Sequence, residues 1–285
     1  MRRRLLLTIF FMMMVHFSAC AATAKKLVFA VHPFLSAIEL QERFLPLIEQ
    51  LSLQSGYKIS FSISKDYETH VDDLCSGKTD LAFIGPAVYV TAFERNPGIK
   101  LLGVLNGKIP LLRGAIVVRD DSALNSPADL KGRSMAFVSP ESTMGFKLAC
   151  YTLRNSGVSL DALGDYVFLG NHENVAFSVL AGRFDAGAVK YEVYEKMAQQ
   201  GLRVLGALPQ VADHPFVASS QLEPAVAQKI KNILLSLDQT ESGKKILRAL
   251  RPDAVAVRPV RDEEYDPLRL CTTSLPSLTA DKHDE

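Results

Sequence analysis

Apolar residues recur along the chain with two alternating periods, one typical of helices and one typical of strands. Phe44, Leu47, Ile48 and Leu51 share one face of a predicted helix. Short apolar or alternating runs predict strands at 27–31, 57–64, 81–84, 115–119, 134–138, 166–169 and 186–189. Helix and strand alternate, which is typical of an α/β protein with parallel sheets. We expect Pro46 to begin or kink its helix, since proline lacks the amide hydrogen that a helix interior uses.

One pattern occurs twice. The residues from Val71 to Ala82 and from Ala176 to Gly187 share the apolar positions of a helix face, a glycine, a basic residue and an aspartate that opens an apolar strand. Gly77 and Gly182 suit the left-handed turn that ends a helix. A further helical pattern follows each copy, so the sequence predicts a helix–strand–helix unit in each of two similar lobes. Such lobes are expected to enclose a ligand cleft.

The N-terminus differs from the rest of the chain. Arginines at 2–4 precede an apolar run up to Phe17, which is typical of a secretion signal and too short for a stable membrane-spanning helix. We expect residues 1–19 to be removed and Cys20 to carry a lipid anchor, because the residues before it resemble the cleavage site of bacterial lipoproteins. Cleavage for soluble export after residues 22–24 is the alternative.

Composition narrows the class of protein. A chain of 285 residues with 48% hydrophobic and 22% charged residues suits about two ordinary globular domains. The net charge is +1 and the basic residues are scattered, which argues against a nucleic-acid partner. If Cys20 is acylated, Cys75, Cys150 and Cys271 allow at most one disulfide. We expect Cys75 and Cys150 to be buried as small hydrophobic side chains.

Polar residues follow several predicted strands, where α/β proteins place their ligands. Ser142 or Thr143 can cap a helix predicted over 143–154, and the hydroxyls and free amides there suit an oxyanion. A cap without a ligand explains Ser142 equally well. His172 and Tyr67 follow strands at the equivalent edges and can each donate a hydrogen bond; the alternative for Tyr67 is packing.

Other chemistry finds little support. The residues around Ser142 lack the glycines of a nucleophile elbow, and Gly77-Lys78-Thr79 lies between helix and strand in the reverse order of a P-loop. No histidine has metal-ligand spacing, so the sequence predicts no metal site and no cofactor. We expect the remaining histidines of the mature chain to be surface or cap residues: His32, His70, His214 and His283.

These residues resemble the phosphate, phosphite and phosphonate substrate-binding proteins of ABC importers. The resemblance runs from about Leu27 to Leu270 and includes Asp66-Tyr67, Gly77–Ala82, Gly85-Pro86, Ser142–Gly145, Gly170–His172 and Asp262–Leu268. It implies an α/β fold like that of type II periplasmic binding proteins, with two similar lobes that each have a mostly parallel sheet. The expected organisation is lobe one at 25–113 and 213–270, lobe two at 114–212, and a flexible tail at 271–285.

The resemblance also implies a ligand site. Ser142, Thr143, Tyr67 and His172 would grip the oxyanion, Glu192 matches an acidic position that faces the amine of aminophosphonates, and Glu192 or Asp213 can receive an acidic hydroxyl of the ligand. The complete expected site is Tyr67, Gly85, Ser142, Thr143, Met144, His172, Glu192 and Asp213. Three positions depart from the family pattern: Met144 replaces a serine, Ile84 replaces a tyrosine, and His214 is an additional residue between Asp213 and Pro215.

The expected function is therefore capture of a phosphonate, phosphite or phosphate by a periplasmic, lipid-anchored protein that delivers it to an ABC permease. One alternative is a periplasmic sensor that reports ligand to a membrane partner such as a histidine kinase. The other is a hydrolase that uses Ser142 and His172, although the spacing of residues indicates no general base or orienting acid.

Overall fold

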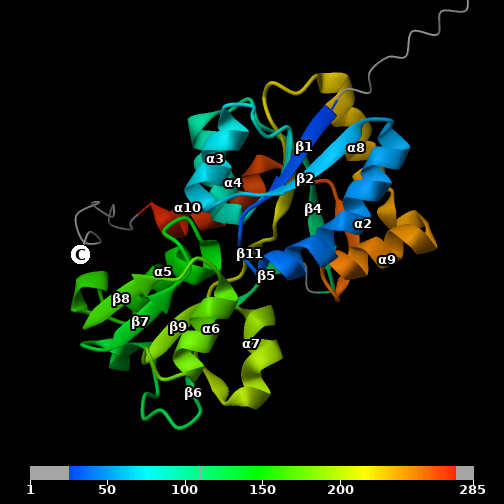
Figure 1. Ribbon diagram of the computed structural model, residues 1–285. Coiled ribbons are helices and arrows are strands. Elements are labelled where there is room, and N and C mark those ends of the chain that lie inside the picture. Colours follow the sequence, from blue (N-terminus) through cyan, green and yellow to red (C-terminus); the bar gives the residue numbers. More distant parts are fainter. Residues whose placement is uncertain (1–25, 109–110, 274–285) are drawn as a thin grey trace, which may run out of the picture.

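The computed structural model describes residues 26–108 and 111–273, so the predicted signal, Cys20 and His283 lie outside the described residues. Two α/β lobes lie one above the other in Figure 1 and are joined by a short two-stranded connection. Within the described ranges, no helix has both the length and the apolar character needed to cross a membrane.

Lobe one is built around a six-stranded sheet of order β13-β4-β12-β3-β1-β2. Its strands are β1 (Lys26–Val31), β2 (Lys58–Ile63), β3 (Leu81–Phe83), β4 (Lys100–Gly107), β12 (Pro215–Ala218) and β13 (Ala254–Arg258). Strand β1 pairs in parallel with β2 and β3, whereas β4, β12 and β13 pair antiparallel. The helices of this lobe are α2 (Ala37–Ser55), α3 (Tyr67–Cys75), α4 (Pro86–Arg95), α8 (Pro224–Leu235) and α9 (Glu241–Leu250).

Lobe two is built around a five-stranded sheet of order β10-β6-β9-β7-β8. Its strands are β6 (Gly114–Arg119), β7 (Ser134–Phe137), β8 (Asp165–Phe168), β9 (Ala186–Lys190) and β10 (Leu202–Ala207). Strand β7 pairs in parallel with β8 and β9, and β6 and β10 form the antiparallel part. The helices are α5 (Leu148–Asn155), α6 (His172–Leu180) and α7 (Tyr191–Met197).

The chain passes twice between the lobes. It leaves lobe one through β5 (Leu111–Leu112) and returns through β11 (Val211–Ala212), and these two strands pair with each other between the sheets (Figure 1). Helix α10 (Asp266–Thr272) then packs against both α4 and α5. Two short crossing strands are typical of a hinge about which one lobe rotates against the other.

The predicted repeat is present as α3–β3–α4 in lobe one and α6–β9–α7 in lobe two. Gly77 and Gly182 both end a helix with positive φ, +76° and +70°. The aspartates that follow have the same role: Asp80 accepts a hydrogen bond from the amide of Val28 at 2.8 Å, and Asp185 accepts one from the amide of Ser134 at 2.9 Å. Each aspartate thereby joins its repeat to the first parallel strand of its lobe.

Two sequence predictions need correction. Helix α2 does not begin at Pro46, because the side chain of Ser36 accepts from the amide of Glu39 and starts the helix earlier. Pro46 lies in its interior, where the buried face formed by Leu40, Phe44, Leu47 and Leu51 offsets the lost hydrogen bond.

The three cysteines in the described part of the chain are free thiols. Cys150 is buried as predicted, whereas Cys75 is only half-buried.

Candidate functional site

A small cavity lies where the two lobes meet. Its volume is about 10 Å³, which is close to the room that the centre of one water molecule needs. Most of its lining residues lie at the ends of parallel strands or the starts of helices, whereas Leu112 and His214 lie in or beside antiparallel strands. The lining comes from both lobes: His32, Tyr67, Gly85, Leu112, Ser142, Thr143, Met144, His172, Lys190 and His214. The structure thus brings together six residues that the sequence singled out, Tyr67, Gly85, Ser142, Thr143, Met144 and His172, although they come from distant parts of the chain.

The segment after β7 forms one wall. Ser142 Oγ accepts a hydrogen bond from the amide of Gly145 at 3.1 Å, so Ser142 is a helix cap as well as a cavity residue. The first turn, Thr143–Lys147, is a π turn rather than the continuous α-helix that the sequence predicted. Gly145 permits this turn, because a Cβ there would lie 2.3 Å from Val138 Cγ2. A π turn widens the helix start, which is common at binding sites.

Thr143 connects the lobes. Its Oγ1 accepts a hydrogen bond from the amide of Ala87, in the first turn of α4, at 2.9 Å. Because the oxygens of Thr143 and Ser142 accept from backbone amides, each hydroxyl keeps its hydrogen for another partner. Both side chains are buried, 5% and 2% exposed, at the junction of the lobes.

Tyr67 and His172 occupy equivalent positions in the repeat. Each is the first residue of its helix, after the capping residues Asp66 and Asn171. Burial raises the pKa of the Tyr67 phenol above its usual range, and a hydrogen bond with Ser142 offsets part of that shift. Tyr67 therefore remains a neutral hydroxyl that can donate to a ligand.

His172 is held in one tautomer. Its Nδ1 accepts a hydrogen bond from the amide of Lys190 at 3.1 Å. Burial, with the nearby Lys190 and His214, lowers the pKa of His172 well below 6.5, so the ring is neutral at pH 7. The proton of a neutral ring whose Nδ1 accepts must be on Nε2. His172 is therefore a hydrogen-bond donor without a charge.

Lys190 is a site residue that the sequence prediction missed. Burial lowers its pKa to about 7, an effect that Glu192 and Asp213 partly offset. Its Nζ lies 3.9 Å from the centre of the Phe34 ring, a cation–π distance. The sequence repeat could have indicated Lys190, because Lys190 occupies the position in the second copy that Gly85 occupies in the first. Gly85 was already a candidate.

The prediction that His32, His70 and His214 are surface or cap residues is wrong. Their exposed fractions are 1%, 0% and 3%, and His32 and His214 line the cavity. Burial lowers the pKa of each ring, to about 4 for His70 and His214. The His32 ring contacts Tyr67 at a centroid distance of 4.6 Å and stacks on His214 at 6.0 Å. The three histidines are far apart in the sequence and match no motif, so the sequence did not indicate that they cluster.

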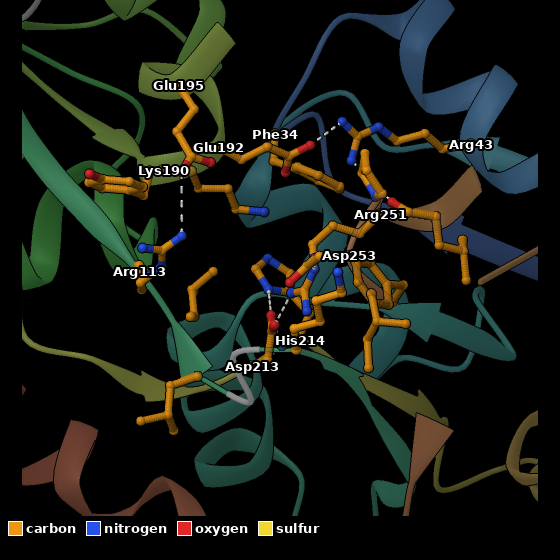
Figure 2. Close-up of a pocket in the computed structure, with 18 residues that line it drawn as sticks. Phe34, Arg43, Arg113, Lys190, Glu192, Glu195, Asp213, His214, Arg251 and Asp253 are labelled. Atoms are coloured by element: carbon orange, nitrogen blue, oxygen red, sulfur yellow. Dashed lines mark hydrogen bonds and ion pairs between the residues drawn. The ribbon is translucent and has the colours of Figure 1, made fainter. Parts of the chain in front are cut away.

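Glu192 and Asp213 do not line the small cavity. They line a larger cavity of about 330 Å³ between the lobes, which shares Lys190, His214 and Leu112 with the small one (Figure 2). Glu192 forms an ion pair with Arg43, and Asp213 one with Arg251. Both carboxylates thus have cationic partners within the protein.

The small cavity is consequently rich in hydrogen-bond donors and contains no carboxylate among its described lining residues. Hydrogen-bond donors that converge on a small space suit an oxyanion, because each gives a charge-assisted hydrogen bond. No group of three or more His, Cys, Asp or Glu within residues 26–108 and 111–273 is arranged to hold a metal ion.

Comparison with known proteins shows the family to which this chain belongs. Residues 29–265 match the family model described as "ABC transporter, phosphonate, periplasmic substrate-binding protein". The chain is 28% identical to the phosphate-import protein PhnD of Mycolicibacterium smegmatis over 265 residues, covering 84% of this chain and 83% of that protein. It is 25% identical to the probable ABC transporter phosphite binding protein PhnD1 of Prochlorococcus marinus, covering 73% and 76%.

Solved structures share the fold. The structure of PhnD1 from Prochlorococcus marinus in complex with methylphosphonate has a TM-score of 0.80 and 23% sequence identity, with 87% of this chain and 97% of that one covered. The fold is thus that of periplasmic binding proteins, as the sequence predicted. The match of the family model over most of the chain settles its membership: this chain belongs to the phosphonate family of periplasmic substrate-binding proteins of ABC transporters.

Proposed function

We propose that this chain captures a small oxyanion of the phosphonate, phosphite or phosphate class in the small cavity and delivers it to an ABC permease, without catalysing a reaction. One observation carries the proposal: donors from both lobes converge on a cavity whose described lining includes no carboxylate. The ligand would accept from Tyr67, the Ser142 and Thr143 hydroxyls and His172. Hydrogen bonds to a charged partner contribute about 1.5 to 3 kcal/mol each.

Contacts between the lobes support capture by closure. The amide of Ser36 donates to Glu173 Oε2 at 2.9 Å, and the amide of His172 donates to the carbonyl of Phe34 at 3.3 Å. Both bonds join lobe one to lobe two directly beside the cavity. An oxyanion can enter only if these contacts open, and its own bonds to both lobes would then favour the closed form.

The geometry gives the hydrolase alternative little support. Ser142 Oγ is engaged with the amide of Gly145, and Nδ1 of His172 with the amide of Lys190. A nucleophilic serine needs a base that accepts its proton and an acid that orients the base. His172 has a backbone amide on Nδ1 instead of an orienting carboxylate.

Calorimetric titration of the mature protein tests the proposal. The ligands are phosphate, phosphite, methylphosphonate, aminoethylphosphonate, arsenate and sulfate. We expect saturable one-to-one binding of at least one phosphorus oxyanion and a matching rise in melting temperature. If none of these ligands gave a heat of binding, the proposal would be contradicted. Release of product from a phosphate ester that Ser142→Ala abolishes would instead establish the hydrolase.

We further propose that the mature chain is exported and anchored through acylated Cys20, with lobe one formed by 25–113 and 213–270 and lobe two by 114–212. Membership in a periplasmic family and the secretion-like N-terminus support export. Labelling of cells with a fatty-acid analogue tests the anchor: the wild-type protein should take up label and fractionate with membranes. Cys20→Ala should lose the label, and an unlabelled wild-type protein would indicate cleavage at residues 22–24.

A further inference from the structure

Two histidines of the small cavity are held in opposite tautomers by their neighbours. Nδ1 of His172 accepts from the Lys190 amide, which leaves the hydrogen on Nε2. His214 has the reverse arrangement, because its Nδ1 lies 2.9 Å from Asp213 Oδ1. Figure 2 shows Asp213 joined to the His214 ring.

The state of Asp213 decides the tautomer of His214. Although burial alone would raise the pKa of Asp213, hydrogen bonding to His214 and the charge of Arg251 lower it well below its usual range. An ionised carboxylate can only accept, so Nδ1 of His214 must carry a hydrogen. Burial and the charge of Lys190 lower the pKa of His214 to about 4 despite the opposing effect of Asp213. At pH 7 the ring is therefore neutral, and Nε2 of His214 has no hydrogen and can accept a hydrogen bond.

The surroundings of His214 fix the ring in place. Phe83 stacks on it at a centroid distance of 5.1 Å and an interplanar angle of 18°, and His32 is parallel to it within 8°. The backbone amide of His214 also donates to Asp213 Oδ1, at 2.7 Å. The ring is held by stacking and by the bond from Nδ1 to Asp213 Oδ1, and the same oxygen also fixes the backbone of His214, so the role of His214 at the cavity is set before any ligand arrives.

We propose that Nε2 of His214, in the ring that Asp213 orients, accepts a hydrogen bond from the acidic hydroxyl of the bound ligand. The cavity would thereby select oxyanions that carry a proton over those that carry none. This inference rests on the proposed function. The cavity needs such an acceptor, because its described lining has no carboxylate and both oxygens of Asp213 already have partners in His214 and Arg251. Asp213 thus acts through His214, the additional residue in the Asp-His-Pro segment, and not by direct contact with the ligand.

Sulfate is the informative competitor. It has the size and shape of phosphate but no hydroxyl, so one of its oxygens would face the lone pair of His214 with no hydrogen between them. A site built to pair a ligand hydroxyl rejects analogues that lack it strongly, because its polar group is left unpaired. His32 offers no equivalent selection: Nδ1 of His32 has no partner in the described structure, so no residue assigns its tautomer.

The experiment combines titration with ¹⁵N NMR of the histidine rings at about pH 6, where phosphate and phosphite retain a hydroxyl. In the wild-type protein we expect phosphate or phosphite to bind at least ~100-fold more tightly than sulfate. The NMR spectrum should show hydrogen on Nδ1 of His214 and on Nε2 of His172. This measurement needs no variant, so it does not depend on whether a substituted protein folds.

Asp213→Asn is the decisive variant, because an amide can donate to Nδ1 of His214 and reverse its tautomer. We expect discrimination against sulfate to fall below about 10-fold. Asp253→Asn is the matched control: it also removes a carboxylate partner of Arg251, at 2.6 Å, whereas the carboxylate that bonds to Nδ1 of His214 is that of Asp213. That variant should keep the wild-type preference.

The outcomes separate the two claims. If no oxyanion binds the wild-type protein, the proposed function itself fails. If phosphate or phosphite binds but sulfate binds within 10-fold, the assignment of His214 is overturned while the proposed function stands. Two other results would also overturn the assignment of His214. One is hydrogen on Nε2 of His214 in the ligand-free protein, and the other is a folded Asp213→Asn variant that still discriminates fully against sulfate.

Discussion

Arg43 on α2 and Glu192 on α7 form an ion pair that joins the two lobes. Arg43 is anchored in lobe one, where Nη1 donates to the carbonyl of Leu250 at 3.0 Å and the guanidinium also pairs with Glu39. The arginine side chain is 9% exposed, so little solvent screens the pair. Its contact with Glu192 exists only when the lobes are together, and the pair therefore favours the closed form.

Glu192→Gln should weaken ligand binding by about 10-fold, because removal of the charge leaves a nearly buried guanidinium less well paired in the closed form. Dissociation should become faster, which stopped-flow measurements would detect. Glu195→Gln is the matched control, since Glu195 lies on the same helix and pairs with Arg113 at 3.6 Å. Equal effects of the two substitutions would contradict a specific role of the Arg43–Glu192 pair in closure.

Thr143→Val should reduce affinity for the oxyanion by about 10-fold. The valine cannot accept from the Ala87 amide, which is then left without a partner in the closed form. Thr143→Ser keeps the hydroxyl and should bind almost as the wild-type protein does. Isothermal titration of the three proteins gives the comparison, and an unchanged affinity of the valine variant would show that the bond between Thr143 and Ala87 does not contribute to closure.

Gly85→Ala should strongly weaken ligand binding while leaving the fold intact. Gly85 has φ −68° and ψ 153°, which alanine adopts without strain. The new methyl group would lie 3.6 Å from both His32 Nε2 and Thr143 Oγ1, inside the space that the ligand needs. We expect the melting temperature without ligand to change little and affinity to fall at least ~100-fold. Wild-type affinity in this variant would place the ligand elsewhere.

Lys190→Met should stabilise the ligand-free protein and weaken oxyanion binding. The pKa of Lys190 falls from 10.5 to about 7 on folding, mainly through burial. Between these pH values the unfolded chain binds a proton that the folded chain lacks, so the contribution of Lys190 to stability rises with pH from about 7 to 10.5. Replacing it with methionine removes a penalty of about 2 to 4 kcal/mol at pH 7.

The measurement is urea unfolding of both proteins at pH 7 and pH 9.5. The stability advantage of Lys190→Met should be larger at pH 7 than at pH 9.5, because the free-energy cost of removing the proton that Lys190 carries in the unfolded chain falls as the pH approaches 10.5. A difference that does not depend on pH would show that Lys190 keeps its ordinary pKa in the folded protein.

Sequence periodicity was informative wherever structure is local. Short apolar runs placed the seven predicted strands to within a few residues but missed β4, β10, β12 and β13. The repeated helix–strand–helix pattern predicted the two similar lobes. Residues at strand ends were found for the same reason, because Ser142, Thr143 and His172 each lie beside a strand that the pattern already indicated. The π turn at Thr143 was not predicted. Gly145 in this turn packs so closely on Val138 that a Cβ there would lie 2.3 Å from Val138 Cγ2, a contact that the apolar period does not show.

The chain by itself determined the α/β class, the duplication and most of the residues that line the small cavity, because hydrophobic period and position after a strand are encoded by neighbouring residues. Tertiary structure alone decided the rest. Burial made His32, His70 and His214 neutral and brought Lys190 to the cavity, and cross-lobe pairing turned Glu192 toward Arg43. Desolvation and long-range ion pairs depend on which distant segments come into contact, and the local pattern of residues does not predict those contacts.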